Sequence, residues 1–515
     1  MLDARARPDL ERLAGLLSAT GPASELRSPL TGEVIGELPT STEDDINAAA
    51  DRARAAQAEW AARPIEERAQ LLLAFHDALL DRRDSFIDLV QSGGGKARLS
   101  ATEEVLHVAL TARYYGRTAR RYLHTERGSG VFPMLTRVDR HYVPKGLVGV
   151  IGPWNYPLIV AISDGLAALV AGNAVLLKPD QQTPLVALAG VELLRSVGMP
   201  ADLWPVVHGP GDVVGPAVIK VSDYVCFTGS TAIGRKVAAQ CAEQLIGCSL
   251  ELGGKNPLLV LDDADVDVAA KGAVRACFSN AGQVCVAAER IYVAAPVLEQ
   301  FTAAFVARTR ALRLGSGMDY SHDIASLIST DHLERVSAHV EDARAKGATV
   351  LTGGRRRPDL GELFYEPTVL TGVTPEMDCY AEETFGPVVS IYPVADDEEA
   401  VQRANDSPYG LNGSVWTSDP ERGRRVASRI SCGTVNVNEG FAATFGSIDA
   451  PMGGMKLSGL GRRHGQEGIR RFVDVQSVAT QVGLPIAPSH GLGGRAFTSV
   501  VTGMLRVLKR AGRAG

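Results

Sequence analysis

One of the seven cysteines stands where a thiol could react. Cys285 follows a polar, glycine-containing stretch, residues 278–284 (FSNAGQV), through which a substrate could approach. A free cysteine is usually an inert, buried residue, and the other six are interpreted in that way. The seven cysteines are an odd number, and no two have C-x-x-C spacing, which disfavours a disulfide framework and a zinc ribbon. We therefore expect a reducing, cytoplasmic setting and no metal site.

A carboxylate and several glycine turns are further candidates for chemistry. Glu251 precedes two glycines in the segment 251–257 (ELGGKNP), where it could be a general base or an ordinary turn residue. A strand-like run, 223–227 (DYVCF), leads into the glycine turn 228–234 (TGSTAIG) and then into a helical segment. Such a turn presents backbone N–H groups and a helix dipole to an anion.

This turn nearly reproduces a P-loop but lacks its essential residues. Arg235 stands where the lysine is required and Lys236 where serine or threonine is required, so a magnesium–nucleotide site is excluded. A second turn, residues 209–211 (GPG), ends another strand-like run. Two glycine turns in one alternating region favour dinucleotide binding over a purely structural role.

The elements that must position these residues follow from the hydrophobic pattern. From Gly146 onward, short apolar runs alternate with helical ones, which predicts a doubly wound parallel sheet, and a second alternating section spans 253–433. Amphipathic helices precede them, for example Ile65–Leu89, and residues 131–143 alternate like a strand. The apolar segment 158–177 is interrupted by polar residues and glycines, so it predicts a buried helix and a strand rather than a membrane span.

Composition narrows the class of protein. The 515 residues are 45% hydrophobic and 22% charged with a formal net charge of −6, which excludes a disordered chain and disfavours a nucleic-acid partner. Residues 1–18 lack the continuous apolar stretch of a signal peptide. The terminal stretch 481–515 differs, because it holds five basic residues and no acidic one. Its segment 497–510 could be a basic amphipathic helix that contacts an anionic membrane; the commoner alternative is a terminal helix docked on the protein, or a frayed end.

Several motifs in order along the chain resemble the NAD(P)-dependent aldehyde dehydrogenase superfamily over residues 25–480. The motifs that carry the resemblance are 153–157 (PWNYP), 177–179 (LKP), 227–230 (FTGS), 251–255 (ELGGK), 282–285 (GQVC), 382–387 (EETFGP) and 451–454 (PMGG). The resemblance implies that Cys285 is the nucleophile and attacks the aldehyde carbon. It also implies that the Asn155 amide and the Cys285 N–H hold the oxyanion and that Glu251 activates water.

The resemblance also implies a nicotinamide cofactor and its binding residues. These are Trp154, Asn155, Lys178, Pro179, Asp180, Gln181, Gly229, Ser230, Gly234, Leu252, Glu383 and Phe385. Members that prefer NAD typically have a glutamate three positions after the lysine, where this chain has Gln181. A neutral side chain there does not repel a 2′-phosphate, which favours NADP, alone or together with NAD. Asp180 beside it could restore negative potential.

The sequence is consistent with two classes of aldehyde substrate. The overall pattern is similar to a succinate-semialdehyde dehydrogenase branch, but the two arginines that hold the substrate carboxylate in that branch are replaced by Ser163 and Ser279. Arg462 or Arg463 could replace them. The remaining expected tunnel residues are largely apolar and favour aliphatic or aromatic aldehydes: Tyr156, Ile159, Val160, Phe441, Phe445 and Met452.

Two other classes of function fit these residues less well. A CoA-acylating dehydrogenase usually lacks the water-activating carboxylate, whereas Glu251 is present. A catalytically silent binding or structural protein would tend to have lost the catalytic set, which this chain retains.

The expected fold is an α/β, aldehyde dehydrogenase-like architecture. The cofactor domain is predicted over 1–125 and 146–252, and the catalytic domain over 253–432. Residues 126–145 and 433–490 would form a small β oligomerisation element and a C-terminal return, and 491–515 a basic tail. The resemblance implies a homodimer or a homotetramer.

Overall fold

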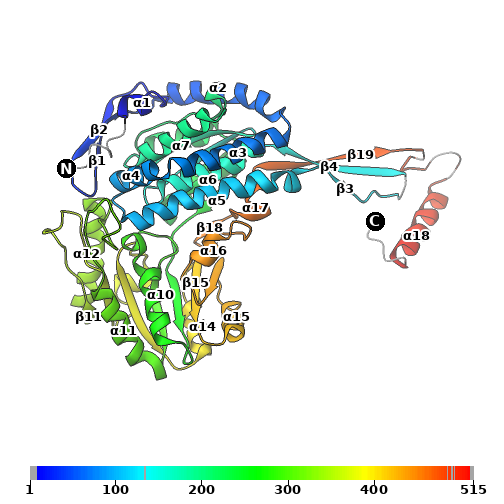
Figure 1. Ribbon diagram of the computed structural model, residues 1–515. Coiled ribbons are helices and arrows are strands. Elements are labelled where there is room, and N and C mark those ends of the chain that lie inside the picture. The colour runs from blue at the N-terminus through cyan, green and yellow to red at the C-terminus, as the bar shows by residue number, and fades with distance from the viewer. Residues whose placement is uncertain (1–8, 133–134, 484, 489–490, 492, 511–515) are drawn as a thin grey trace.

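A computed structural model of the chain describes residues 9–132, 135–483, 485–488, 491 and 493–510. Two sheets form the body, and a narrow β arm projects from it with a helix at its far end (Figure 1). The first eight residues and Arg513 of the basic tail lie outside the described residues.

The first sheet has five strands in the order β18-β8-β7-β5-β6, and all are parallel except β18. Its strands are β5 (Leu147–Ile151), β6 (Ala174–Lys178), β7 (Tyr224–Thr228), β8 (Gly247–Glu251) and β18 (Gly459–Leu460). Every residue of β5 and β6 is buried. Such continuous apolar runs are typical of parallel strands covered on both faces.

Helices surround this sheet. They are α1 (Leu10–Ala14), α2 (Glu43–Ala61), α3 (Ile65–Asp81), α4 (Arg83–Gly94), α5 (Arg98–Leu123), α6 (Pro157–Val170), α7 (Pro184–Ser196), α8 (Gly211–Val221) and α9 (Thr231–Glu243). A hairpin of β1 (Ala23–Arg27) and β2 (Val34–Pro39) accompanies them. The apolar segment predicted as a buried helix and a strand is α6, buried throughout, followed by β6.

The prediction of one continuous helix over Ile65–Leu89 is wrong. The chain leaves the helical region at Arg82 (φ −103°, ψ 13°), and two helices, α3 and α4, result. Polar residues on both sides of Arg82 leave the apolar spacing almost undisturbed, so periodicity does not reveal the break.

The second sheet has seven strands in the order β11-β12-β13-β10-β9-β15-β16, and only β11 is antiparallel to its neighbour. The strands are β9 (Asn256–Val260), β10 (Ala288–Ala294), β11 (Thr349–Thr352), β12 (Thr368–Thr371), β13 (Val388–Val394), β15 (Asn412–Trp416) and β16 (Thr434–Val437). Strand β16 lies just beyond residue 432, where the sequence predicts the end of the catalytic domain. The division into domains stays a prediction.

The helices of this half are shorter on average. They are α10 (Val266–Phe278), α11 (Leu298–Arg310), α12 (Thr330–Ala345), α13 (Asp378–Ala381), α14 (Asp397–Asn405), α15 (Pro420–Ala427) and α16 (Ala442–Gly446), with the short 3-10 turn η3 (Ser279–Gly282). The helix α17 (Gly465–Arg470) instead packs against α5 and α6 of the first half. A two-residue ladder joins β14 (Tyr409–Gly410) and β17 (Met455–Lys456). Each sheet has its own buried hydrophobic core.

The arm is a three-stranded antiparallel sheet. It consists of β3 (Glu126–Gly128), β4 (Thr136–Pro144) and β19 (Val473–Gln481), with nine residue pairs between β4 and β19. The strand predicted over 131–143 therefore begins only at Thr136.

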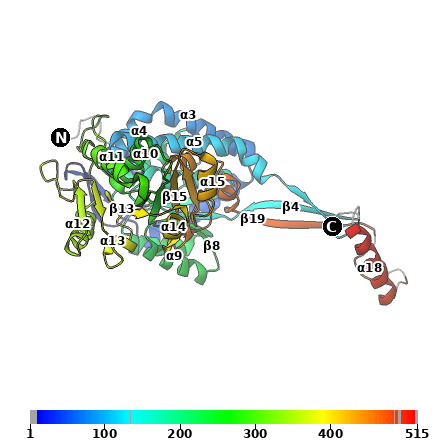
Figure 2. The same ribbon diagram turned by 90° about the horizontal axis from the view of Figure 1, so that it is seen from below.

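Beyond the arm lies α18 (Gly494–Arg510), the helix predicted in the basic tail. Figure 2 shows it well away from both sheets, so it is not docked on the body. Among the described residues, no helix is long and apolar enough to cross a membrane.

Candidate active site

A strained loop carries Cys285. The residues before it, Asn280, Ala281 and Gly282, have φ values of 50°, 55° and 73°, a left-handed conformation that is costly for the first two. Side chains hold the loop in this shape, because the Asn280 amide donates to the Gln283 carbonyl oxygen over 3.2 Å and the Gln283 amide donates back to Asn280 over 3.1 Å. A side chain at Gly282 would collide with the backbone of Gly386.

Asn155 reaches the same loop from the first sheet. It follows β5, and its Nδ2 donates to the Gln283 carbonyl oxygen over 3.1 Å. The structure thus brings the amide predicted to hold an oxyanion to the loop of the predicted nucleophile.

A buried ion pair fixes the start of α6, directly after Asn155. Lys96 and Glu104 lie 2.6 Å apart with both side chains fully buried. The Glu104 carboxylate accepts the N–H groups of Leu158 and Ile159 over 3.0 and 3.2 Å. The Lys96 ammonium lies 3.6 Å from the ring centre of Tyr156, a cation–π contact. Interior charges therefore position the loop that carries Asn155.

Glu251 ends β8 and is buried, with 4% of its surface exposed. Its Oε1 has no hydrogen-bond partner in the described part of the chain. Burial raises the pKa of this carboxyl to about 7, although the charges of Arg463 and Arg471 lower it. A carboxyl with such a pKa is suited to general base catalysis near neutral pH.

The Cys285 thiol has a raised pKa. Burial raises the pKa to about 12, and the negative charges of Glu251 and Glu383 raise it further. At neutral pH the sulfur is therefore protonated, and a neighbouring base must accept its proton before it attacks.

Two cavities meet at these residues. The larger measures about 740 Å³ and the smaller about 500 Å³, both including space open to solvent. We name them, after their predicted occupants, the cofactor cleft and the aldehyde tunnel. Four residues line both: Asn155, Thr228, Glu251 and Cys285. A molecule in either cavity would reach the sulfur from its own side.

The cofactor cleft gathers many of the predicted cofactor residues. Those that line it are Trp154, Asn155, Gly229, Ser230, Leu252, Glu383 and Phe385, joined by Pro153, Gly253, His332 and Arg335. Ser230 caps α9 by accepting the N–H of Ile233, so this helix begins at the cleft. Glu383 accepts the N–H of Gly254 over 2.8 Å, and burial raises the pKa of its carboxyl to about 8.

Three aromatic rings line one wall of the cleft, and the sequence predicted two of them, Trp154 and Phe385. Trp154 meets His332 and Phe385 edge to face, with centroids 5.4 and 5.5 Å apart. His332 also hydrogen-bonds the Phe385 carbonyl oxygen over 2.8 Å. His332 lies on α12 without a motif around it, so only the folded contact reveals it.

A buried pair supports the segment that carries Glu383 and Phe385. Glu289 lies 2.5 Å from Lys255 and accepts the N–H groups of Thr384 and Phe385 over 3.0 and 2.9 Å. This support could not be predicted from the sequence either, because Glu289 lies on β10 without a recognisable motif.

The remaining predicted cofactor residues lie apart from this cleft lining. Lys178 ends β6 in register with Ile151 of β5, at the same sheet edge, and its Nζ donates to the Pro179 carbonyl oxygen over 3.1 Å. Asp180 accepts the N–H of Gln182, and Gln181 is exposed. Gly234 lets α9 approach β8 closely, since a side chain there would collide with Leu252.

The tunnel contains all six predicted wall residues. Tyr156, Ile159, Val160, Phe441, Phe445 and Met452 line it with Val284 and Val286. Arg463 also lines it. By contrast, Arg462 donates to the backbone of Gly454 and Gly461, and Ser279 donates to the Arg275 carbonyl oxygen.

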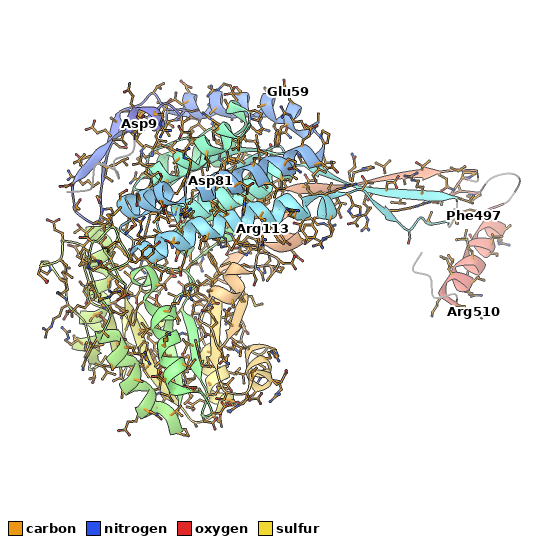
Figure 3. All side chains as sticks on the ribbon, viewed as in Figure 1. Asp9, Glu59, Asp81, Arg113, Phe497 and Arg510 are labelled. Carbon is orange, nitrogen blue, oxygen red and sulfur yellow. The ribbon has the colours of Figure 1, made fainter. Side chains whose placement is uncertain are left out.

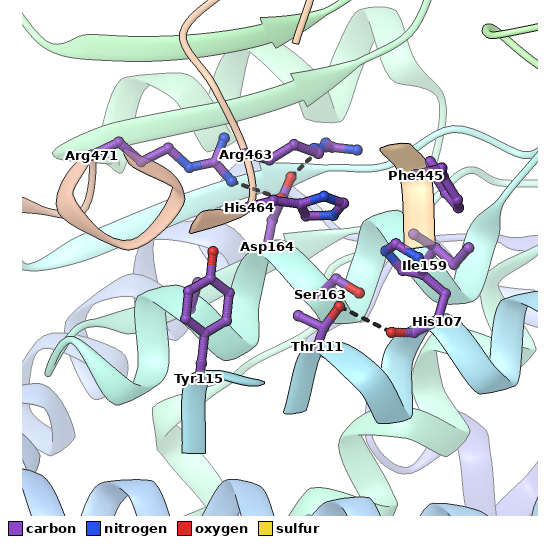
Figure 4. Close-up of a pocket in the computed structure, with 11 residues that line it drawn as sticks. His107, Thr111, Tyr115, Ile159, Ser163, Asp164, Phe445, Arg463, His464 and Arg471 are labelled. Carbon is purple, nitrogen blue, oxygen red and sulfur yellow. Dashed lines mark hydrogen bonds and ion pairs between the residues drawn. The ribbon is translucent and has the colours of Figure 1, made fainter. Parts of the chain in front are cut away.

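Arg463 belongs to a buried charged cluster beside the tunnel (Figure 4). Its guanidinium lies 2.8 Å from Asp164, which also pairs with Arg471 over 2.6 Å, so the three charges sum to +1. Burial raises the pKa of Asp164, but the two guanidiniums more than offset this, and the carboxyl stays ionised.

The cluster borders a small polar chamber that shares Ile159, Phe445 and Arg463 with the tunnel. His107, stacked 4.3 Å from Phe445, and His464 face it together with Ser163 (Figure 4). Burial lowers the pKa of His107 to about 3, with a further contribution from Arg463, so its ring is neutral.

Comparison with known proteins agrees with this geometry. The model of the aldehyde dehydrogenase family matches residues 17–478. The chain belongs to this family. It is an NAD(P)-dependent aldehyde dehydrogenase, which oxidises an aldehyde to a carboxylic acid.

Individual relatives are similar to this chain over most of their length. A protein of Mycolicibacterium smegmatis named "Putative succinate-semialdehyde dehydrogenase", with NADP in its name, is 50% identical over 506 residues, 98% of each chain. A Mycobacterium bovis protein named in the same way is 49% identical over 96% of each chain. Betaine aldehyde dehydrogenase of Staphylococcus aureus, solved with NAD+, superposes with a TM-score of 0.87 and 33% identity, covering 91% of this chain and 94% of the other.

Proposed function

We propose that Cys285, Asn155 and Glu251 carry out the oxidation and that succinate semialdehyde is the substrate. The observation that supports the catalytic assignment is the meeting of the two cavities at these three side chains.

The cleft fits a nicotinamide dinucleotide. It offers the start of α9 for phosphate oxygens, the close approach of the Glu383 carboxylate to Gly253, and the rings of Trp154 and Phe385. When bound there, the nicotinamide accepts the hydride that leaves the substrate carbon.

In the first half of the reaction, Glu251 accepts the proton of the Cys285 thiol. The sulfur forms a bond to the aldehyde carbon, and the carbonyl oxygen becomes an oxyanion held by the Asn155 amide and the Cys285 N–H. Loss of hydride from the same carbon restores the C=O bond and leaves a thioester on Cys285.

In the second half, Glu251 first releases the thiol proton to solvent and then accepts a proton from water as the water oxygen attacks the thioester carbon. Collapse of that adduct breaks the C–S bond and releases the carboxylic acid. The Cys285 sulfur takes the proton that Glu251 accepted from water, which restores the carboxylate, and the raised pKa of the thiol makes its protonated form the resting form.

NADP is the cofactor that we propose. The exposed side chain of Gln181 carries no charge to repel a 2′-phosphate, and the relatives from Mycolicibacterium and Mycobacterium bear NADP in their names. The ratio of kcat/KM for NADP and NAD tests this proposal, and Gln181→Glu is expected to shift the ratio toward NAD.

Arg463 supports succinate semialdehyde as the substrate. It is a buried cation in an otherwise largely apolar tunnel, and its Nε–H has no hydrogen-bond partner among the residues described. A substrate carboxylate could accept that N–H and balance the +1 charge of the cluster. This cation comes from the C-terminal return rather than from positions 163 and 279.

The apolar wall favours a second candidate, a broad-specificity enzyme for aliphatic and aromatic aldehydes. Measuring kcat/KM with succinate semialdehyde, hexanal and benzaldehyde separates the two. We expect Arg463→Met to lower kcat/KM about 10- to 100-fold for succinate semialdehyde, with Arg463→Lys closer to the parent. An equal loss for hexanal would contradict the anchoring role.

We also propose that the arm pairs with other copies of the chain. Most of β19 is exposed, including the apolar side chains of Val475 and Val478. An exposed edge of this kind invites further pairing. Light scattering coupled to size-exclusion chromatography would distinguish a homodimer or homotetramer from a monomer.

A further inference from the structure

The terminal helix α18 divides its side chains into two kinds. At about 100° per residue, Phe497, Val501, Met504 and Leu508 form the centre of one face. Val500, Leu505 and Val507 flank them, so an uninterrupted apolar arc covers almost half of the helix. Arg495, Arg506, Lys509 and Arg510 all fall on the opposite face, with the polar residues Ser499 and Thr502.

Among the described residues, no other element buries either face of this helix. None of its residues is buried, and Val500, Leu505 and Val507 expose 63%, 55% and 62% of their surfaces. Figures 1 and 3 show it beyond the arm and apart from the body. Within the described residues, no hydrogen bond or ion pair connects α18 to either sheet.

Charge separates α18 from the rest of the molecule. All 59 acidic residues lie before position 481, whereas the stretch 481–515 contains only basic charges. The exposed arginines of the body often have carboxylate partners, such as Arg54 with Asp223 and Arg429 with Glu398. The polar face of α18 carries four cations with no neighbouring anion on the helix.

We propose that α18 binds an anionic lipid surface, with its apolar face in the acyl boundary and its cations at the headgroups. A helix that is strongly amphipathic, weakly hydrophobic overall and basic on its polar face has the features of an interfacial membrane helix. Pairing of two α18 helices through their apolar faces would bring eight cations together without any anion. A helix docked on another protein surface needs only a hydrated polar face, which acidic residues serve as well as basic ones.

The position of α18 suits this role. It lies at the end of the arm, apart from the acidic body of its own chain (Figure 2), so its apolar face can meet a planar surface. Binding would hold the enzyme on the membrane without covering the cofactor cleft. The inference does not depend on which aldehyde the enzyme oxidises.

Flotation of the full-length protein with lipid vesicles tests the proposal. We expect it to float with vesicles of phosphatidylcholine mixed with phosphatidylglycerol, to stay behind with phosphatidylcholine alone, and to release as salt increases. Each basic residue near an anionic surface contributes about fivefold in affinity. Arg506→Gln, Lys509→Gln and Arg510→Gln together should therefore weaken binding about 100-fold, whereas Arg506→Lys, Lys509→Arg and Arg510→Lys should preserve it.

A second pair of variants tests the apolar face. Val500→Ser with Leu505→Ser should abolish flotation, and the matched change on the polar face, Ser499→Ala with Thr502→Ala, should not. Aldehyde oxidation by every variant should equal that of the parent, which confirms that each one is folded.

Three results would overturn the proposal. The first is absence of flotation with the anionic vesicles at low salt. The second is equal binding of the parent and the charge-removed variant. The third is a change of oligomeric state in the Val500→Ser/Leu505→Ser variant without flotation of the parent, which would assign α18 to a second copy of the chain.

Discussion

Two groups of cationic side chains in this protein differ in burial and in the presence of an acidic partner. Arg463 and Arg471 are buried beside the tunnel and share the carboxylate of Asp164. The cations of α18 are exposed on a helix without an acidic residue. Burial requires a partner for a charge because desolvation is costly, whereas exposed charges need none. The first group can therefore serve chemistry and the second a large, anionic surface.

The largest effect is expected from removing the nucleophile, which lines the same tunnel as Arg463. Cys285→Ala should abolish aldehyde oxidation, because no other thiol lines the two cavities among the described residues. NADPH formation followed by absorbance measures it, and retained binding of NADP shows that the variant is folded. Turnover in this variant would refute the mechanism.

Loss of the carboxylate of Asp164, which Arg463 and Arg471 share, should strongly lower the stability of the fold. Asp164→Asn leaves two buried guanidiniums without their counter-charge and should lower the free energy of unfolding by about 3–5 kcal/mol. Denaturation in urea measures the change. Glu421→Gln, an exposed partner of Arg424, is the control and should change stability by less than about 0.5 kcal/mol. Equal effects would remove the distinction between buried and exposed charges.

The oxyanion donor should account for a smaller but still large effect. Asn155→Ala removes the amide that reaches the Cys285 loop, and kcat/KM should fall about 10²- to 10³-fold. Steady-state kinetics with the preferred aldehyde tests this. A loss of less than tenfold would show that the backbone N–H alone suffices.

The ionisation of Glu251 should appear in the pH profile. Its pKa is raised to about 7 by burial, and the base is active only when ionised, so kcat/KM should fall as pH decreases below 7. Because Arg463 lowers this pKa, Arg463→Met should move the acidic limb to higher pH. A profile that is flat between pH 5 and 8 would exclude Glu251 as the essential base.

Removing one of the exposed cations of α18 should have the smallest effect on the stability of the fold. Arg495→Gln removes a cation with no acidic neighbour on its helix and should change the free energy of unfolding by less than about 0.5 kcal/mol. The same urea experiment compares it directly with Asp164→Asn. A large loss of stability would indicate a hidden anionic partner for α18.

Short sequence motifs were sufficient to predict the family, the fold class and several candidate site residues. The family, the α/β fold and aldehyde oxidation are confirmed by the comparisons, and the roles of the individual site residues remain predictions. Motifs located Cys285 and Glu251 because each lies within a short recognisable segment. The structure adds that Asn155 reaches the Cys285 loop, a contact between residues more than a hundred positions apart.

Residues that act through tertiary contacts escaped the sequence. His107 and His332 lie on long helices among ordinary amphipathic spacing, and neither has a motif around it. Arg463 was noted as a possible anchor, but its place in the tunnel depends on how the C-terminal return crosses α6. The break at Arg82 was missed for a similar reason, since packing decides it rather than periodicity.

The contact between Lys96 and the ring of Tyr156 limits how freely this enzyme could be redesigned. Tyr156 is an obvious residue to shrink if bulkier aldehydes are to be admitted, because it forms part of the tunnel wall. Its ring also faces the ammonium whose partner, Glu104, anchors the first turn of α6. Engineering for a wider channel would thus disturb the support of Asn155, and a gain in substrate range would be accompanied by slower chemistry.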